Sequence, residues 1–367
     1  MKDSRTHLDS ITALRGLAAL GVVLFHVRIF LWVGWNEIRG NPSKYSNWDH
    51  FASWFSIPTP FMGEGVLLFF VISGFCIHYP QSARKDKLNL RKYISRRFLR
   101  IYPPYAVTVG LSLLVIACYP WGNIMIEPVL PSLFLMQNYY PETNSQIGSN
   151  FSLWSIATEI EFYLAYPVLL LIWRKLGVVQ SLNIFGAISV IAIGLYFYGI
   201  KSMAFCSLTF YIMWWAGAGL AELYVKGQLN RPSRSMIFLA IALLSTGVVT
   251  QIQGQNLVMI QRFLFGGFFL ILIWWALSMG KSLNFRRTIL GRTLLYLGRV
   301  SYSLYLIHYP MLQLIGYLWV DKFGSKPSNF FVPILFSIGS IFVASVFYKL
   351  VEEPSHKLAI YFGNKNK

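Results

Sequence analysis

The apolar stretch at residues 8–30 carries two ionisable side chains, Arg15 and His26, in a run long enough to span a membrane. A charged side chain at the centre of a bilayer costs about 2.5–3.5 kcal/mol, so such residues usually serve a function. Their spacing of eleven residues gives about three helical turns and a rise of about 16 Å, which places both on one face. Histidine suits proton abstraction near neutral pH, and arginine can neutralise a phosphate or a developing oxyanion. The alternative is structural: His26 hydrogen-bonds a neighbouring helix, and Arg15 extends its charge to the membrane surface.

Three arginines of the segment RRFLR, Arg96, Arg97 and Arg100, form a basic cluster. Arg97 and Arg100 lie at positions i and i+3, on one helix face at the predicted cytoplasmic surface. Two forked guanidinium groups there make a good clamp for a phosphorylated ligand. Attraction to anionic lipid headgroups explains the same cluster equally well, so both interpretations stay open.

Two carboxylates, Glu159 and Glu161, follow Trp154 in the stretch WSIATEIEFY. Side chains two residues apart on a helix point about 200° away from each other, so these two cannot work as a pair. We expect one to face the helix bundle and the other to face a loop or an interface. For a carboxylate in the bundle, catalysis and a buried ion pair with Arg or His are about equally plausible.

A third polar stretch, VSYSLYLIHYP, places Tyr302, Tyr305 and His308 at intervals of three residues. Tyr305 and His308 share a helix face, where we expect a hydrogen-bonded contact with another helix. His308 is also a second candidate for proton transfer, although packing is the favoured role. The sequence contains no nucleophile elbow, no glycine-rich phosphate loop and no clustered metal ligands, so no metal is expected. Glu64 is a weak candidate, and no role is predicted for four histidines near surfaces or helix ends: His7, His50, His78 and His356.

Membrane helices must position these residues, because the composition is typical of a chain that folds in lipid. Of the 367 residues, 55% are hydrophobic and only 13% are charged, and the mean hydropathy is +0.51. A soluble core of this length needs far fewer apolar residues. The sequence therefore predicts an all-α, polytopic integral membrane protein with about ten spans. We place the spans at residues 8–30, 62–80, 104–120, 152–173, 182–200, 204–224, 235–251, 258–280, 294–319 and 331–351.

The net charge of +18 indicates membrane topology rather than binding to nucleic acid. If the N-terminus is cytoplasmic and the spans alternate, most of the 32 Lys and Arg residues fall on the cytoplasmic side, as the positive-inside rule predicts. With an even number of spans, both termini are cytoplasmic. No cleavable signal peptide and no appended soluble domain are expected, so residues 1–367 are interpreted as a single membrane domain.

Two long loops connect the early spans. The outer loop at 34–60 is aromatic and polar and is expected to form an interfacial cap. The inner loop at 81–105 is strongly basic and is predicted to be helical up to Tyr102, where Pro103 and Pro104 break or kink the chain. The cysteines lack the spacing of a disulfide framework or a zinc site and are interpreted as small buried hydrophobes: Cys76, Cys118 and Cys206.

In their order along the chain, these motifs resemble acyltransferase family 3, the membrane proteins that O-acylate bacterial surface carbohydrates. LDSITALRGLAALGVVLFHV is similar to the family's opening helix, with Arg, ten residues and then His. Five further segments match in order: GVLLFFVISGF, which contains Ser73, RRFLRIYP, WSIATEIEFYLAYP, SYSLYLIHYP and VEEP. The chain departs from the family pattern at Leu67, where many members have Asp, and at Ile160, which replaces a polar residue. The second departure favours Glu159 over Glu161 as the motif carboxylate.

The resemblance implies an O-acyltransferase of the bacterial inner (cytoplasmic) membrane. Its donor would be a cytosolic acyl-CoA, usually acetyl-CoA. Its acceptor would be a hydroxyl of a cell-surface polysaccharide or lipid-linked saccharide, such as the O-antigen of lipopolysaccharide or an exopolysaccharide. In this scheme the arginine cluster binds the CoA phosphates, and His26 is the general base or a transient acyl carrier. Arg15 stabilises charge on the donor, Glu159 orients a partner, and the supporting residues are Ser73, Trp154, Tyr302, Tyr305 and His308.

Other functions fit parts of the same pattern. A transporter or flippase for a lipid-linked saccharide explains the spans and the intramembrane arginine, but not a basic clamp aligned with a histidine. An acyltransferase with a lipid, peptidoglycan or small-molecule acceptor keeps the chemistry and changes the substrate. A structural or sensory membrane protein leaves the buried charges unexplained. The pattern leaves open whether the active form is a homodimer.

Overall fold

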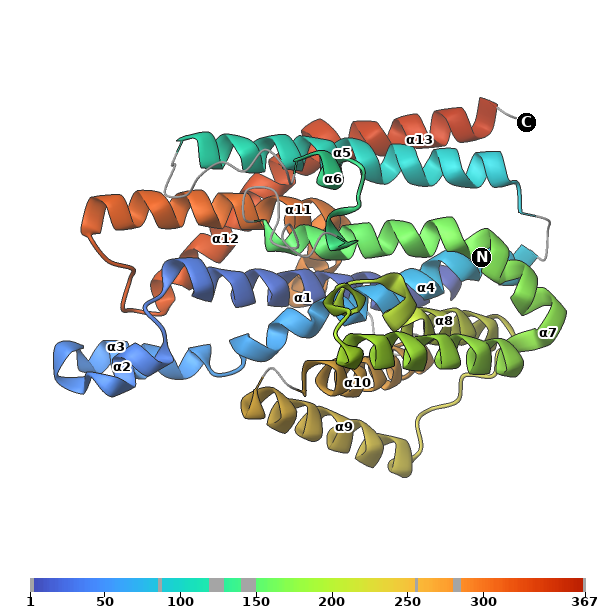
Figure 1. The fold of residues 1–367 in the computed structure, drawn as a ribbon, viewed down its shortest axis with the longest axis horizontal. Helices are drawn as coiled ribbons and strands as arrows, with labels where there is room; N and C mark the ends of the chain where they lie inside the picture. Colours follow the sequence, from blue (N-terminus) through green and yellow to red (C-terminus); the bar gives the residue numbers. More distant parts are fainter. Residues whose placement is uncertain are drawn as a thin grey trace.

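The structure, a computed structural model, describes residues 3–84, 88–118, 129–139, 150–254, 257–279 and 285–365. Within these ranges all regular elements are helices, which confirms the all-α prediction (Figure 1). The α-helices are α1 (Asp3–Leu31), α2 (Trp35–Gly40), α3 (Asn47–Ser53), α4 (Gly65–Arg84), α5 (Leu90–Cys118), α6 (Val129–Leu133), α7 (Trp154–Tyr198), α8 (Ser207–Val225), α9 (Arg234–Gln253), α10 (Val258–Ser278), α11 (Ile289–Phe323), α12 (Phe331–Phe347) and α13 (Glu353–Lys365).

Shorter helical segments connect the long helices. The 3-10 segments are η1 (Pro42–Lys44), η2 (Trp54–Ser56), η3 (Thr59–Glu64), η4 (Gln137–Tyr139), η6 (Phe151–Leu153) and η7 (Lys201–Ala204). A π-helical turn, η9 (Tyr348–Glu352), joins α12 to α13. Residues 119–120 and 280, at the ends of two predicted spans, and residues 140–149 of an outer loop lie outside the described residues.

Eight described segments are long and apolar enough to cross a membrane. One of them, Phe151–Tyr198, has 48 residues, about twice the length that a single crossing needs. It contains α7, whose two arms meet at Gly177, where φ is 79° and ψ is 179° (Figure 1). This conformation favours glycine, because a side chain at positive φ is strained. The predicted spans 152–173 and 182–200 correspond to the two arms.

The helix α11 is 35 residues long, but its composition does not place it among these eight segments. It runs parallel to α1: Arg15 contacts Ser301 at one end of the pair, and Gly316 packs against Phe30 at the other. Counting α11, and counting the arms of α7 separately, turns the eight segments into the predicted ten. The number of spans and the cytoplasmic location of both termini remain predictions.

The prediction for Pro103 and Pro104 is a break or a kink. The helix α5 continues through both prolines to Cys118, so the break does not occur. Pro103 cannot donate to the carbonyl of Leu99, one turn earlier, but the hydroxyl of Ser355 in α13 donates to that carbonyl instead. In membrane helices, prolines are tolerated where neighbouring polar side chains satisfy the freed backbone groups in this way. The helix therefore reaches the bundle without interruption.

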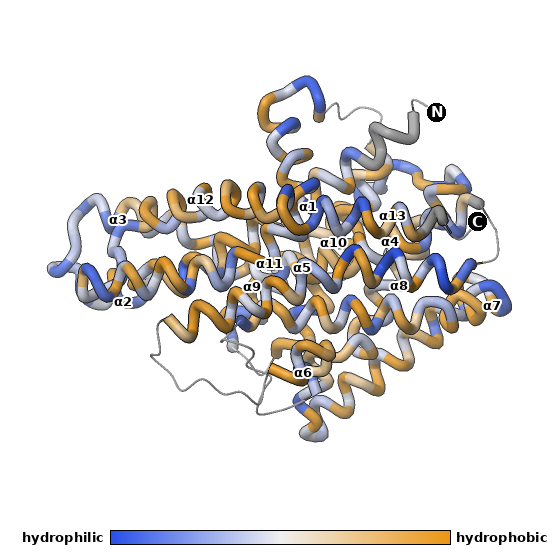
Figure 2. The backbone as a smooth tube through the Cα atoms, turned by 90° about the horizontal axis from the view of Figure 1, so that it is seen from above, coloured by the Kyte–Doolittle hydropathy of each residue, from blue (hydrophilic) through white to orange (hydrophobic). Residues whose placement is uncertain are grey.

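The outer loop folds into α2, α3 and three 3-10 segments at one end of the molecule (Figure 1). It has a small core of its own, formed by Trp32, Ile38, Ala52 and Phe330. Four aromatic side chains remain half-exposed: Trp48, Phe51, Trp54 and Phe55. In Figure 2 the tip near α3 and the turn of α7 are hydrophilic, whereas the helices between them are largely hydrophobic. Aromatic rings at such an end suit the membrane interface.

Candidate active site

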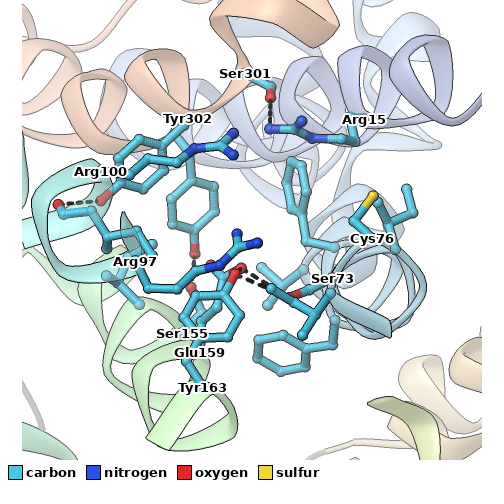
Figure 3. A pocket seen from close by; sticks show the side chains of 18 residues that line it. Arg15, Ser73, Cys76, Arg97, Arg100, Ser155, Glu159, Tyr163, Ser301 and Tyr302 are labelled. Atoms are coloured by element: carbon cyan, nitrogen blue, oxygen red, sulfur yellow. Dashed lines mark hydrogen bonds between the residues drawn. The ribbon is translucent and has the colours of Figure 1, made fainter. Parts of the chain in front are cut away.

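A cavity of about 190 Å³ lies between α1, α4, α5, α7 and α11. Figure 3 shows the guanidinium groups of Arg15, Arg97 and Arg100 pointing into it from α1 and α5. The cavity therefore brings together residues of five separate sequence motifs. Its other polar lining residues are Ser73, Cys76, Ser155, Glu159, Tyr163, Ser301, Tyr302 and Tyr305.

The three arginines are held in place without carboxylate partners. Arg15 donates to the hydroxyl of Ser301 at 3.0 Å, and Arg97 lies over the ring of Tyr163 at 5.5 Å. Among the described residues, no carboxylate oxygen lies within ion-pair distance of Arg15, Arg97 or Arg100. Three positive charges facing one small cavity without paired anions make a site that can bind phosphate or stabilise an oxyanion.

Glu159 is the carboxylate of this cavity. It accepts hydrogen bonds from Tyr163, one turn later in α7, and from the Ser73 hydroxyl of α4 at 3.1 Å. Ser73 in turn accepts from the indole nitrogen of Trp214 at 3.3 Å. Glu159 is thus oriented by donors on its own helix and on α4, so its position is fixed before any ligand binds.

Glu161 points away from the cavity, as the 200° separation predicts. It accepts from the backbone N–H of Ser207, the first residue of α8, at 2.9 Å. A carboxylate at a helix N-terminus is favoured by the helix dipole. The prediction that one carboxylate faces the bundle and the other an interface is confirmed.

Tyr302 and Tyr305 line the cavity from α11. The hydroxyl of Tyr302 donates to the Ile101 carbonyl of α5 at 2.8 Å, and that of Tyr305 donates to the Ser152 carbonyl at 2.9 Å. Ser155 also contacts the Tyr305 hydroxyl at 2.6 Å. These bonds tie α11 to α5 and to the start of α7.

His26 does not line the cavity. Its ring lies beside His308, with 3.1 Å between His26 Nδ1 and His308 Nε2, and Tyr305 lies between His308 and the cavity, with ring centroids 5.7 Å apart. The spacing of Arg15 and His26 predicts a shared face, and both side chains do contact α11, at Ser301 and His308.

The hydrogen bonds of the histidine pair determine its neutral tautomers. His308 Nδ1 lies 3.1 Å from the Leu304 carbonyl, which can only accept, so this nitrogen carries the proton and Nε2 is an acceptor. His26 Nδ1 faces two acceptors, the Val22 carbonyl at 3.0 Å and His308 Nε2, so it is the donor to both. The basic nitrogen of His26 is therefore Nε2, and the residue keeps 8% of its surface exposed.

Two other predicted residues lie outside the cavity lining. Arg96 is on the same helix as Arg97 but does not line the cavity. Trp154 packs among aromatic rings, including Phe70 and Phe205, with the guanidinium of Arg262 5.3 Å from its ring. Their predicted roles in cofactor binding and support remain untested.

Three residues of the site carry no distinctive sequence signal. Tyr163, Ser155 and Cys76 are ordinary residues of apolar helices, and only the azimuth of each helix shows that they face the cavity. The interpretation of all cysteines as buried is wrong for two of them, because Cys76 opens onto the cavity and Cys118 is exposed at the end of α5; Cys206 is buried.

Two buried polar pairs, Glu64 with Gln261 and His78 with Glu222, lie outside the cavity. Glu64 accepts from the Gln261 amide at 2.7 Å, and Arg262 donates to the Ala204 carbonyl at 2.6 Å. His78, near the end of the predicted span 62–80, is only 1% exposed and lies 2.9 Å from Glu222. His78 is surrounded by the rings of Trp173 and Trp215. These pairs hold helices together.

Comparison with known proteins identifies the family. A family model described as an acyltransferase domain matches residues 8–349. The O-acetyltransferase OatA of Staphylococcus aureus is 24% identical over 389 residues, which cover 96% of this chain and 58% of that protein. The peptidoglycan O-acetyltransferase OatA of Listeria monocytogenes is 23% identical, with 96% and 56% covered. The acyltransferase MdmB of Streptomyces mycarofaciens is 30% identical over 176 residues, 47% of this chain and 41% of that protein.

The chain thus spans about half the length of these relatives. No solved structure matches it. The family model, in contrast, covers nearly the whole chain and every motif from the first span to α12, including the arginines and Glu159 of the cavity. This polytopic membrane protein belongs to acyltransferase family 3.

Proposed function

We propose that the protein is an O-acetyltransferase of the bacterial inner membrane, which moves an acetyl group from cytosolic acetyl-CoA to a hydroxyl of a cell-surface polysaccharide or lipid-linked saccharide. The observation that carries this proposal is the cavity in which Arg15, Arg97 and Arg100 face Glu159 without ion-pair partners. The names of the OatA relatives support the acetyl group and a cell-surface acceptor.

In this proposal the donor enters the cavity on the side formed by α5. Arg97 and Arg100 form bidentate hydrogen bonds with the phosphates of CoA, which Arg binds better than Lys because its donors form a planar fork. The thioester then reaches toward Arg15 and Glu159. The excess of positive charge favours this polyanionic donor over a neutral thioester.

The chemical step uses the basic nitrogen of the histidine pair. His26 Nε2 takes the proton of the acceptor hydroxyl while the hydroxyl oxygen attacks the thioester carbonyl, and Arg15, about three helical turns away on α1, stabilises charge on the bound donor. Collapse of the tetrahedral intermediate that forms breaks the C–S bond, and the departing CoA sulfur receives the proton from His26. In the alternative route, Nε2 attacks the thioester carbonyl and the C–S bond breaks, which releases the CoA thiolate. The acceptor hydroxyl then attacks the acetyl group on Nε2, the C–N bond breaks, and the hydroxyl proton passes to the thiolate.

Both routes require movement at Tyr305. This side chain lines the cavity and contacts His308 on its other side, so it separates the donor site from His26. Among the described residues, its hydroxyl hydrogen-bonds only Ser152, just before α7, and Ser155, at the start of α7. A rotation of this ring that breaks these two bonds joins the donor site to the histidine pair.

Labelled acetate tests the proposal. Cells with and without the protein are fed ¹³C-acetate, and their surface glycans are analysed by mass spectrometry. Label that enters a polysaccharide only when the protein is present supports the proposal. The purified protein in liposomes should also release CoA when it is given acetyl-CoA and the glycan of cells that lack the protein. A transporter would release no CoA. Unchanged glycans together with no CoA release would overturn the proposal.

A further inference from the structure

A second cavity, of about 500 Å³, lies at the outer end of α1. One wall is formed by the end of α1 and the start of α2, and the other by η2 and η3. It is separate from the cavity of the arginines and has no role in the proposed chemistry. The residues that characterise it are Arg28, Trp32, Trp35, Asn36, Glu37 and Phe61.

Arg28 is the unusual residue of this cavity. Its Nε is buried and has no hydrogen-bond partner among the described residues. Its guanidinium group lies 5.4 Å from the ring of Phe25, and no described carboxylate is within ion-pair distance. Arg28 as a whole is half-buried, but a buried N–H without an acceptor is costly unless a ligand supplies one, so this group indicates an anionic ligand.

The carboxylate in the same cavity does not neutralise Arg28. Glu37 is bound to Lys44 at 3.1 Å and to the Tyr45 hydroxyl at 2.8 Å. The hydrogen bonds from Tyr45 and Lys44 lower the pKa of Glu37, so its charge is balanced at the rim of the cavity. Arg28 is left as the free charge of the cavity.

The remaining lining favours a sugar as the carrier of the anion. Trp35 and Phe61 offer flat apolar rings that can pack against the C–H face of a sugar, and the exposed amide of Asn36 can hydrogen-bond its hydroxyls. Trp35 is held rigidly, because Arg39 lies 4.4 Å from its ring and Trp54 packs edge-on against it at 5.2 Å.

Arg28 follows His26 by two residues, which is about 3 Å along the helix axis and about 200° around it. The cavity is therefore at the level of His26 but on the other side of α1. It cannot hold the reacting hydroxyl, but it can hold a neighbouring unit of the same chain. We propose that this cavity is a subsite for a unit of the acceptor saccharide that carries a carboxylate or phosphate, with Arg28 binding the anion. This inference rests on the proposed function.

A labelling experiment tests the subsite without measuring acyl transfer. Ile57, an exposed residue of the cavity wall, is changed to Cys in a chain with Cys76→Ser and Cys118→Ser, and the protein is placed in phosphatidylcholine nanodiscs. The rate of maleimide labelling is measured with trigalacturonate, glucose 1-phosphate, or neutral maltotriose. We expect the anionic sugars to slow labelling and maltotriose to leave it unchanged.

Two variants show whether Arg28 is responsible. Arg28→Gln should weaken protection about tenfold or more, because hydrogen bonds to charged groups are strong. Arg234→Gln is the matched control, because Arg234, the first residue of α9, is exposed and does not line the cavity, so protection should remain.

Three results would overturn the subsite. Maltotriose could protect as well as the anionic sugars, no sugar could protect, or phosphatidylglycerol in the nanodisc could block labelling through Arg28 without any sugar. The last result would make the cavity a lipid-headgroup site. Protection of Cys76 by acetyl-CoA in a Cys118→Ser chain reports separately on the donor site, so failure of the subsite is distinguishable from failure of the proposed function.

Discussion

The proton on His26 Nδ1 is shared between the Val22 carbonyl and His308, so base chemistry at this ring must use Nε2. His308 is fixed in turn by the Leu304 carbonyl. In this pair His26 Nδ1 donates to His308 Nε2, and His26 Nε2 is left as the basic nitrogen. The sequence predicts a helix-to-helix contact for His308, and the contact proves to be with the other candidate base.

His26→Ala should lower the rate of acetyl transfer by about 10²–10⁴-fold, the usual contribution of a positioned general base. Donor binding, measured as protection of Cys76 by acetyl-CoA, should not change, because His26 lies outside the donor cavity. The control is His50→Ala in the outer loop, which should transfer acetyl groups normally. Full activity in a correctly inserted His26→Ala protein would show that another group is the base.

Arg97→Ala should raise the KM for acetyl-CoA about tenfold or more while changing kcat less, since it removes a charged hydrogen-bond donor from the donor site. Arg96→Ala is the comparison, because Arg96 is adjacent in sequence but does not line the cavity. Initial rates over a range of acetyl-CoA concentrations measure both variants. Equal effects of the two substitutions would favour general attraction to lipid headgroups over a specific clamp.

For single residues, the sequence correctly predicts the surroundings of a side chain where these depend only on angles around one helix. The 200° between Glu159 and Glu161 correctly predicts that they face different surroundings. The sequence does not predict which side chains face a shared cavity, because this depends on how the helices are rotated relative to one another. Nothing in the sequence around Cys76 or Tyr163 indicates that they face the same cavity as Arg15.

The contact between α1 and α11 positions both halves of the proposed chemistry. A side chain at Gly298 would place its Cβ 1.9 Å from the Thr12 carbonyl, and one at Gly16 would place it 2.5 Å from the Leu294 carbonyl. Such close backbone contact is typical of small residues at membrane helix interfaces. Arg15 with Ser301 and His26 with His308 both lie along this interface.

Gly298→Ala should therefore reduce acetyl transfer and lower thermal stability by about 1–3 kcal/mol, because the added methyl group forces the helices apart. Gly339→Ala is the matched control, since a Cβ at Gly339 of α12 meets no atom within 4 Å. Activity assays and thermal unfolding in detergent measure both effects. Normal activity and stability of Gly298→Ala would mean that the helices do not approach so closely.

The helices themselves are largely predictable from apolar length, but their continuity is not. Gly177 joins two predicted spans into one helix with a bend, and Ser355 supports the helix at Pro103 that local rules would break. The first depends on a single backbone conformation and the second on a partner more than two hundred residues away. Neither is visible in a window of hydrophobicity.

At the scale of the whole molecule, the distribution of basic residues gives the donor cavity an orientation. Arg97 and Arg100 are in the basic segment before the third predicted span, which the positive-inside rule places at the cytoplasmic side. The second cavity lies beyond His26 along α1, at the other end. Donor and acceptor sites on opposite sides of the membrane follow from this arrangement if the predicted topology holds.

Cys76 provides a test of that orientation, because its thiol opens onto the donor cavity. In a Cys118→Ser chain, a membrane-impermeant maleimide should label Cys76 in inside-out vesicles but not in intact cells, and acetyl-CoA should slow the labelling. Cys206 is buried and should not react from either side, which makes it an internal control. Labelling of Cys76 only from the outside would reverse the topology, and the donor would then have to be extracellular. Labelling from the inside that acetyl-CoA does not slow would leave the topology intact and remove the cavity as the donor site.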